Sequence, residues 1–172
     1  PPITRLVGIL CSLIDHNRSG KSLIKEGDIL LGKAIIVYGS NTGNTEILAG
    51  ALSEELNTRF DVTTRNVIEV RPEEILDYDL IVLGSSTWNE GELQDDFQYF
   101  YDEMDEVDLT GKRVAVFGPG DSSWDEYCRA VDILEEKSIE LKADLVTTGF
   151  KWDGDIDETA IKEIKKWGSQ LH

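Results

Sequence analysis

The most informative stretch of this 172-residue chain is Ala34-Ile35-Ile36-Val37-Tyr38-Gly39-Ser40-Asn41-Thr42-Gly43-Asn44-Thr45. Its apolar first half predicts a buried strand, and a helical pattern begins near Glu46, just after the hydroxyl-rich second half. Backbone N–H groups and the positive end of the helix dipole attract anions to the start of such a helix. The turn contains no Lys or Arg. The sequence therefore predicts a site for one phosphate monoester, held by N–H groups and by Ser, Thr and Asn side chains.

This turn lacks the motifs of the common nucleotide-binding proteins. No Lys follows its glycine, as the P-loop pattern requires, and the G-x-G-x-x-G pattern is absent. ATP, GTP and NAD are therefore poor candidates for the ligand. A simpler interpretation stays open at this point, because Ser, Thr and Asn also cap helices without binding any ligand.

The composition is that of one globular domain that can bury a substantial core. Acidic side chains number 34 and basic ones 17, so the formal net charge is −17. Such a charge disfavours nucleic acid and anionic membranes as partners and favours basic protein surfaces. The two cysteines, Cys11 and Cys128, are too few for a disulfide framework and have no neighbours at metal-ligand spacing. We interpret both as buried free thiols, which fits the reducing cytoplasm, and expect no metal site.

Residues 1–32 are interpreted as an amino-terminal extension of unknown role, ahead of an acidic domain that spans residues 33–172. Residues 1–33 carry five basic against three acidic side chains, a net charge of +2, whereas the remainder carries 12 against 31. The apolar segment 6–14 is shorter than the roughly 18 residues that cross a membrane, and it lacks a signal-peptidase site. We interpret it as a docking helix or strand, or as an artificial remnant. The opposite charge of the extension leads to the hypothesis that it docks on the acidic face of the domain.

Apolar, strand-like runs alternate with helical patterns after residue 33, which is typical of βαβ units around a parallel sheet. The predicted strands are residues 34–39, 60–66, 80–85, 113–118 and 145–149. The predicted helices are residues 45–57, 93–104, 124–141 and 156–171. We predict an α/β three-layer sandwich with a five-stranded parallel sheet in the order 2-1-3-4-5. Ligands of such sheets bind where the strand order reverses, here outside the carboxyl ends of strands 1, 3 and 4.

The loops after strands 3 and 4 each contain a tryptophan, Trp88 in residues 85–91 and Trp124 in residues 118–124. An exposed indole is unfavourable unless it packs on something, and two facing indoles could hold a flat aromatic ring between them. Each tryptophan taken alone could simply cover a strand end. Together with the phosphate turn, the two indicate a planar ring joined to one phosphate by a short linker, which is the shape of flavin mononucleotide (FMN).

Three segments of the chain resemble the flavin-binding loops of flavodoxins. They are Ser40-Asn41-Thr42-Gly43-Asn44-Thr45, Ser86-Thr87-Trp88-Asn89-Glu90-Gly91-Glu92-Leu93-Gln94-Asp95-Asp96-Phe97 and Phe117-Gly118-Pro119-Gly120-Asp121-Ser122-Ser123. The resemblance covers residues 33–172 and implies a flavodoxin-like fold that binds FMN. The second loop is similar to that of long-chain flavodoxins, whereas the uninterrupted last strand region and the total length are similar to the short-chain group.

The resemblance assigns a role to each part of this site. Trp88 would cover one face of the isoalloxazine ring, and Trp124 stands where the family usually has a tyrosine on the other face. Backbone groups near Asp121 and Cys128 would hydrogen-bond the pyrimidine end of the ring. The phosphate would be bound by Ser40, Thr42, Asn44 and Thr45, with Ser86 or Thr87 contributing. The complete set of predicted FMN-binding residues is Ser40, Asn41, Thr42, Gly43, Asn44, Thr45, Ser86, Thr87, Trp88, Asn89, Glu90, Gly91, Gly118, Gly120, Asp121, Trp124, Tyr127 and Cys128.

The resemblance also implies how the protein would tune its flavin. In flavodoxins the carbonyl of the residue after the tryptophan, here Asn89, turns towards flavin N5 through a flip of the peptide to Glu90. That carbonyl stabilises the neutral semiquinone. Asn tolerates positive φ better than most residues but less easily than Gly, so we expect the flip to occur at some strain. Asn89 could also be an ordinary turn residue.

The charge around the expected flavin site has one sign. No Lys or Arg occurs in residues 34–58, 84–111 or 114–128, the three stretches expected to surround the flavin. Desolvation and repulsion from carboxylates would both disfavour the anionic hydroquinone. These carboxylates could simply form a solvated helix face. They could also form a surface that steers basic partners towards the flavin. Nine of them lie in residues 84–111, namely Glu90, Glu92, Asp95, Asp96, Asp102, Glu103, Asp105, Glu106 and Asp108.

The sequence therefore predicts a low-potential one-electron carrier with non-covalently bound FMN, which cycles between semiquinone and hydroquinone and is not an enzyme. We expect a cytoplasmic monomer whose partners are the basic faces of redox proteins, namely a flavodoxin reductase and electron acceptors. The alternatives are an FMN-dependent quinone or azo reductase, for which no large insertion is visible, and the FMN domain of a diflavin reductase. A phosphoacceptor domain of similar topology would need carboxylates and a Lys at the strand ends, but the first strand ends in Tyr38-Gly39-Ser40.

Overall fold

A parallel β-sheet runs through the middle of the protein, whose computed structural model describes residues 30–172. Its strands pair in the order β2-β1-β3-β6-β7, and β8 also pairs with β6. The predicted order 2-1-3-4-5 is confirmed, with β6 as the fourth strand and the β7–β8 region as the fifth. The strands are β1 (Lys33–Gly39), β2 (Asp61–Asn66), β3 (Leu80–Ser85), β6 (Arg113–Gly120), β7 (Asp144–Leu145) and β8 (Phe150–Asp153).

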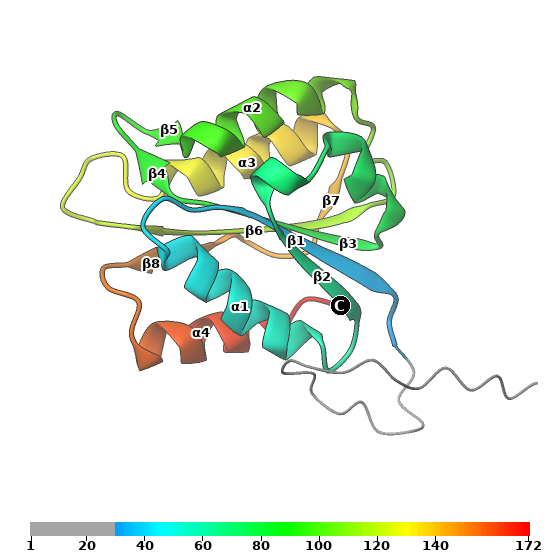
Figure 1. The fold of residues 1–172 in the computed structure, drawn as a ribbon, viewed down its shortest axis with the longest axis horizontal. Helices are drawn as coiled ribbons and strands as arrows, with labels where there is room; N and C mark the ends of the chain where they lie inside the picture. The colour runs from blue at the N-terminus through cyan, green and yellow to red at the C-terminus, as the bar shows by residue number, and fades with distance from the viewer. Residues whose placement is uncertain (1–29) are drawn as a thin grey trace, which may run out of the picture.

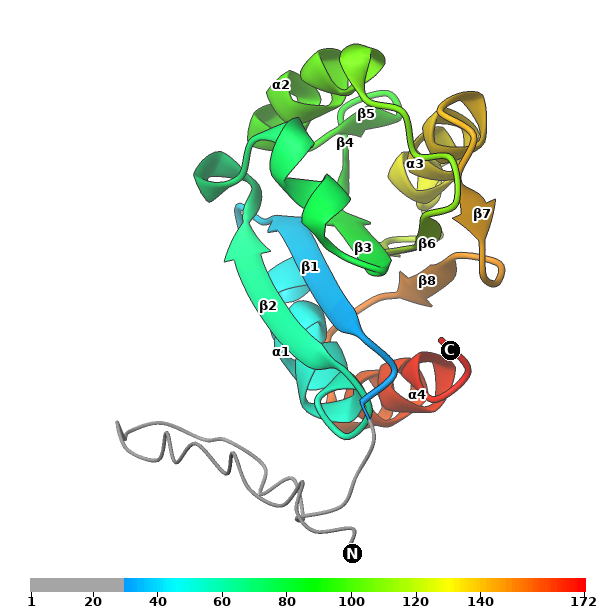
Figure 2. The ribbon, with the colours of Figure 1, turned by 90° about the vertical axis from the view of Figure 1, so that its right-hand side faces the viewer.

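Helices cover both faces of this sheet, with α1 and α4 on one face and α2 and α3 on the other (Figures 1 and 2). The α-helices are α1 (Asn44–Leu56), α2 (Asp95–Glu103), α3 (Arg129–Glu140) and α4 (Glu158–Gly168). Short 3₁₀ helices are η1 (Val67–Glu69), η2 (Pro72–Asp77) and η3 (Met104–Glu106). This arrangement confirms the predicted three-layer sandwich.

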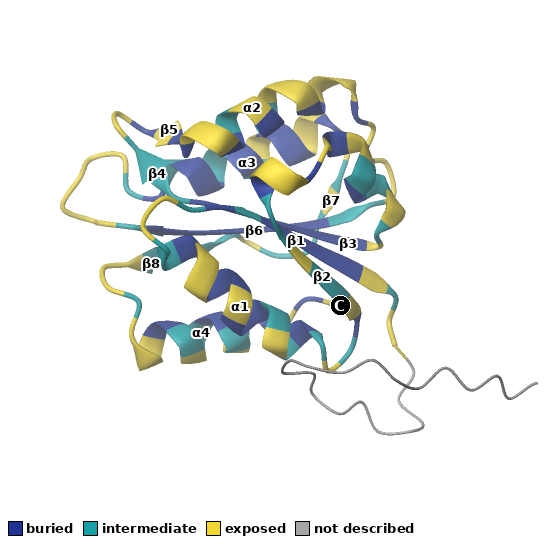
Figure 3. Cartoon of the chain, viewed as in Figure 1, coloured by how far each residue is buried: buried dark blue, intermediate teal, exposed yellow. Residues whose placement is uncertain are grey.

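The sequence of β1 explains why two helical layers form. Successive side chains of a strand point to opposite faces of the sheet. Ile35 and Val37 join the core cluster on the side of α2 and α3, whereas Ala34 and Ile36 join the cluster on the side of α1 and α4. All four side chains are fully buried, and the sheet interior is dark blue in Figure 3. A continuous apolar run is therefore what a strand covered on both faces requires.

The predicted fifth strand, residues 145–149, is wrong in its bounds and its continuity. The chain pairs with β6 at Asp144–Leu145 and again at Phe150–Asp153, and leaves the sheet in between. The Gly149 N–H donates to Glu135 Oε1 at 2.7 Å, and the carbonyl of Thr148 accepts from the Trp167 indole at 3.0 Å. Side chains from α3 and α4 thus bind backbone groups that a regular strand would pair with β6.

The predicted helix over residues 124–141 starts five residues too early. Cys128 has φ 51°, which an α-helix cannot accommodate, and α3 begins only at Arg129. Before it, the chain turns twice, with hydrogen bonds from Trp124 N to the Asp121 carbonyl and from Arg129 N to the Glu126 carbonyl. Residues 121–128 therefore form a loop rather than the first turns of the helix.

Several expectations concern residues outside the described range 30–172. They are the docking helix or strand in residues 6–14, the contact of the extension with the acidic face and the burial of Cys11. Within residues 30–172, the helices are too short or too polar to cross a lipid bilayer.

Candidate functional site

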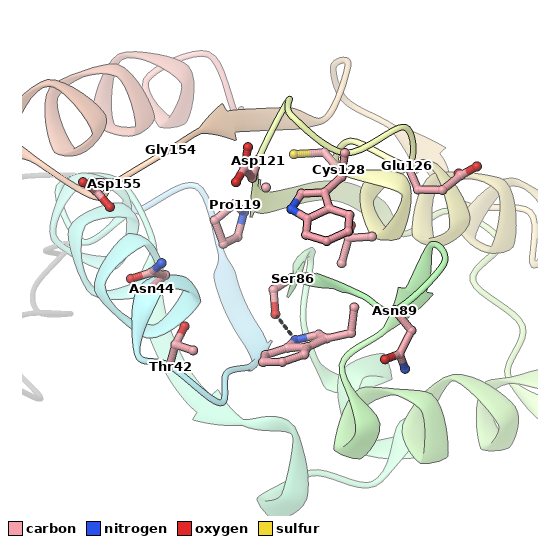
Figure 4. A pocket seen from close by; sticks show the side chains of 14 residues that line it. Thr42, Asn44, Ser86, Asn89, Pro119, Asp121, Glu126, Cys128, Gly154 and Asp155 are labelled. Atoms are coloured by element: carbon pink, nitrogen blue, oxygen red, sulfur yellow. Dashed lines mark hydrogen bonds between the residues drawn. The ribbon is translucent and has the colours of Figure 1, made fainter.

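The three predicted loops line one cleft of about 590 Å³ at the carboxyl ends of the parallel strands (Figure 4). This volume lies in the range of small-molecule and cofactor sites. The predicted residues that line it are Thr42, Asn44, Ser86, Thr87, Trp88, Asn89, Gly120, Asp121, Trp124 and Cys128. The cleft therefore lies at the edge of the sheet where the strand order predicts a ligand site.

The remaining predicted residues do not line the cleft, and four other residues do. The predicted residues outside the lining are Ser40, Asn41, Gly43, Thr45, Glu90, Gly91, Gly118 and Tyr127. The lining residues that were not predicted are Pro119, Glu126, Gly154 and Asp155. Pro119 lies inside one of the segments that resemble flavodoxins. Glu126 lies between the predicted residues Trp124 and Tyr127. Gly154 and Asp155 follow β8, whose carboxyl end the strand-order rule does not include.

The turn between β1 and α1 leaves polar groups without partners. No side chain caps α1, so the N–H groups of its first turn keep their hydrogen-bonding capacity. Thr45 is only 1% exposed, and among the described residues its Oγ1 atom has no hydrogen-bond partner. An unpaired buried hydroxyl is costly unless a ligand satisfies it. The turn therefore fits an anion that accepts hydrogen bonds from these groups.

Two side chains of this turn have structural roles. Ser40 Oγ accepts a hydrogen bond from Gly43 N at 3.1 Å and so shapes the turn. Asn41 Oδ1 accepts from Gln94 Nε2 at 2.8 Å. Gln94 is fully buried, and its Oε1 atom caps α2 by accepting from Phe97 N at 3.0 Å. Gln94 thus ties the turn to α2, a support that sequence reasoning did not identify.

The loop after β3 folds into an antiparallel hairpin of β4 (Thr87–Trp88) and β5 (Glu92–Leu93), which was not predicted. Ser86 Oγ accepts from the Trp88 indole at 2.8 Å, the dashed line in Figure 4. Thr87 Oγ1 accepts from Ala130 N, at the start of α3, at 3.0 Å. The two hydroxyls thus fix the indole and the hairpin, while each keeps its own proton to donate.

The tip of this hairpin holds Asn89 at φ 47°, in the left-handed region that asparagine tolerates better than most residues. Gly91 N donates to the Trp88 carbonyl at 3.1 Å and closes the turn. Positive φ at Asn89 but not at Glu90 is the pattern of a type II′ turn. Rotating the peptide between them by half a turn would give Glu90 a positive φ as well, as in a type I′ turn. The strain of such a flip therefore falls on Glu90 rather than on Asn89.

The loop after β6 is fastened to the end of β8. Asp153 accepts two hydrogen bonds from Ser122, one from its N–H at 2.8 Å and one from its hydroxyl at 2.5 Å. Gly154 N donates to the Gly120 carbonyl at 3.0 Å. Hydrogen bonds from Ser123 hold the pKa of the Asp121 carboxyl below its usual value. The loop is thereby shaped, yet Trp124 remains 70% exposed at the cleft.

Cys128 lies beneath this loop and is 1% exposed, which confirms the expected buried free thiol. Its Sγ atom lies 3.6 Å from the Gly118 carbonyl oxygen and 3.8 Å from that of Trp152. A Cβ atom on Gly120 would stand 2.6 Å from Sγ, so this approach requires glycine. Burial raises the pKa of the thiol to about 11, and the group is therefore neutral and unreactive at physiological pH.

Two cations from outside the three acidic stretches come close to the cleft. Arg129 packs beside Gly91 at the hairpin, and Lys151 is near enough to Cys128 to lower its pKa against the larger effect of burial. Each cation is paired with a carboxylate of α3, Arg129 with Glu136 at 3.0 Å and Lys151 with Asp132 at 2.7 Å. The surroundings of the cleft therefore include positive as well as negative side chains, although the sequence indicated negative ones alone.

Comparisons with known proteins agree with this fold. The model of the flavodoxin family matches residues 36–168. A flavodoxin of Maridesulfovibrio salexigens is 43% identical over 145 residues, covering 82% of this chain and 97% of that protein. A flavodoxin of Synechocystis is 36% identical over 142 residues, which are 79% of this chain and 82% of that protein.

A crystal structure of oxidised flavodoxin 2 from Bacillus cereus superposes with a TM-score of 0.78 at 37% identity, covering 81% of this chain and 97% of that one. In flavodoxins, FMN occupies the site where the strand order reverses. The cleft described above lies at that point of the sheet and contains two indoles, and the turn beside it holds the unpaired Thr45 hydroxyl. The chain belongs to the flavodoxin family, whose members are electron-transfer proteins that carry FMN and transform no substrate of their own.

Proposed function

We propose that this protein is a low-potential one-electron carrier that holds the FMN phosphate on the β1–α1 turn and the isoalloxazine ring between Trp88 and Trp124. Ser40, Thr42, Asn44 and Thr45 would form the phosphate site, Ser40 chiefly by shaping the turn. Ser86 would donate its remaining proton to the same phosphate. Family membership supports the cofactor, and the cleft supports the assignment of the residues.

The observation that carries this assignment is the unpaired, buried Oγ1 atom of Thr45 at the uncapped start of α1. A phosphate can accept from this hydroxyl and from the first N–H groups of the helix at once. A turn that merely capped the helix would leave the hydroxyl unsatisfied. The 70% exposure of Trp124 at the other end of the cleft is the second sign that a ligand completes the site.

FMN, when bound, supplies one-electron chemistry, and the protein decides which of its charge states is favoured. We propose that the Asn89 carbonyl would accept a hydrogen bond from a proton on flavin N5. Backbone groups near Asp121 and Cys128 would hydrogen-bond the pyrimidine end of the ring. Hydrogen bonds from Ser123 lower the pKa of the Asp121 carboxyl, which therefore stays ionised to a lower pH than an ordinary aspartate. Glu126 and Asp155 also line the cleft. These carboxylates would oppose negative charge on the ring and lower the second midpoint potential.

The same carboxylates support a proposal about partners. We infer a cytoplasmic monomer that meets the basic faces of a flavodoxin reductase and of electron acceptors, because oppositely charged surfaces steer encounter. The net charge of −17 and the acidic rim of the cleft support this proposal. Rates of electron transfer to a basic partner should then fall steeply as salt is added.

The decisive experiment is stepwise anaerobic reduction of the FMN-loaded protein, followed by its absorption spectrum. Two separated one-electron steps, with no direct bleaching by NAD(P)H, are the expected result. Direct two-electron bleaching by NAD(P)H would instead favour a quinone or azo reductase. Protein that fails to bind added FMN would overturn the proposal.

A further inference from the structure

Arg129 is the first residue of α3, and its side chain lies at the edge of the flavin cleft. A Cβ atom placed on Gly91, in the hairpin turn, would stand 3.2 Å from Arg129 Cγ and 3.2 Å from Glu126 Oε2. Glu126 itself lines the cleft. The stem of Arg129 is thus packed against the hairpin tip and next to a residue of the cleft wall.

The guanidinium group, by contrast, is turned away from the cleft. Its Nη1 and Nη2 atoms bind the two carboxylate oxygens of Glu136 at 3.0 and 3.4 Å. Glu136 lies seven residues farther along α3, which is about 10 Å along the helix axis. Arg129 accordingly does not line the cleft, although its neighbours Glu126 and Cys128 do.

A two-point contact of this kind has a strong directional preference, because the planar guanidinium matches the carboxylate. The other carboxylates around Arg129 are Glu126, on the cleft side, and Asp132, on its own helix. Without Glu136, the long Arg129 side chain would be attracted to Glu126 and hence to the cleft.

We infer that Glu136 is a positioning residue that holds the Arg129 guanidinium away from the cleft and so keeps the cofactor in acidic surroundings. This inference rests on the proposed FMN site. Releasing the guanidinium would bring a positive charge towards the ring and favour uptake of the second electron. A unit charge at about 10 Å under surface screening changes such an equilibrium constant by about two- to fourfold.

The test is a double-mutant cycle on the FMN-loaded protein, with both midpoint potentials as the readout. Glu136→Gln should raise the second potential by an amount that corresponds to this two- to fourfold change. In an Arg129→Gln background, the same substitution should have almost no effect. Glu140→Gln is the matched control, because it removes an equal charge from α3 one turn farther from the cleft.

Two results would overturn the inference. An equal rise in both backgrounds would show that Glu136 acts only as a distant negative charge, and no rise in either would show that Arg129 does not respond to it. Glu136→Asp should restore most of the wild-type potential if the ion pair is what matters.

A measurement on FMN-free protein separates this inference from the flavin assignment. The NMR signal of Arg129 Nε–H should shift in Glu136→Gln but not in Glu140→Gln. An unshifted signal would overturn the ion pair even if FMN binds as proposed. A shifted signal in a protein that refuses FMN would instead overturn the proposed function and leave the ion pair intact.

Discussion

The proposed phosphate turn, residues 40–45, and the two loops proposed to face the flavin ring, residues 85–91 and 118–124, are built in different ways. The turn of residues 40–45 joins β1 directly to α1, and the groups that it would offer to an anion come from one continuous segment of chain. The ring-facing loops depend on contacts with remote residues, Thr87 with Ala130 and Ser122 with Asp153. Helix geometry supplies donors locally, whereas the spacing of two indoles requires the packed fold. The difference teaches that the two ends of one cofactor can be tested separately.

The largest expected effect isolates the phosphate end. Riboflavin has the same ring as FMN but no phosphate, so it cannot use the N–H groups of α1 or the Thr45 hydroxyl. We expect riboflavin to bind about 1,000-fold more weakly than FMN, since two or three charge-assisted hydrogen bonds are lost. Titration of FMN-free protein with both ligands measures this ratio. Equal affinities would mean that the turn holds no phosphate.

The next effect belongs to the ring-facing region, because Cys128 supports it from below. In the unfolded chain the thiol loses its proton near pH 9, whereas burial in the folded protein raises its pKa to about 11. The folded state therefore keeps the proton longer, and its stability is complete below pH 9 and falls between pH 9 and 11. The expected loss is about 2 kcal/mol in the free energy of unfolding.

Denaturant unfolding at several pH values checks this loss. When the stability of each protein is expressed relative to its value at pH 8, Cys128→Ala should remove the dependence between pH 9 and 10, before Tyr127 begins to contribute. If the pH dependence of unfolding is the same in Cys128→Ala as in the wild type, the loss of stability comes from other groups. Tyr127 is one such group, since burial raises its pKa to about 12.

A third prediction tests the turn by one atom. Thr45→Val keeps the shape of the side chain and removes the unpaired Oγ1 atom. FMN should bind about tenfold more weakly, while the FMN-free protein should gain about 1 kcal/mol because a buried unsatisfied hydroxyl is gone. Calorimetry of both forms, with Thr45→Ser as the control that retains the hydroxyl, measures the two changes. Destabilised FMN-free protein would contradict the ligand role of this atom.

The smallest effect tests the remote support of the ring-facing loop. Asp153→Ala removes both acceptors of Ser122, so residues 121–124 lose part of their fixed shape before FMN binds. We expect FMN affinity to fall about threefold, in line with one or two exposed hydrogen bonds. Riboflavin affinity should fall by the same factor, because the phosphate turn is untouched. A loss seen with FMN alone would break the separation of the two regions.

The fold was largely predictable because its signals are local. The apolar runs that became β1 and β3 are buried on both faces, and continuous burial leaves a continuous apolar sequence. The strand after α3 was predicted less well, since Glu135 and Trp167 decide where residues 148–149 leave the sheet. The hairpin of β4 and β5 was missed because each strand is only two residues long.

The sequence by itself determined the sheet order, the position of the cleft and the turn between β1 and α1, because each follows from periodicity or from a motif in one segment. Only the tertiary structure decided that Gln94 holds Asn41, that Asp153 holds Ser122 and that Glu136 pairs with Arg129. The physical reason is that the two kinds of feature depend on interactions of different range along the chain. Backbone geometry acts between neighbours in the chain, whereas a side-chain hydrogen bond or ion pair forms only where packing brings its two partners together.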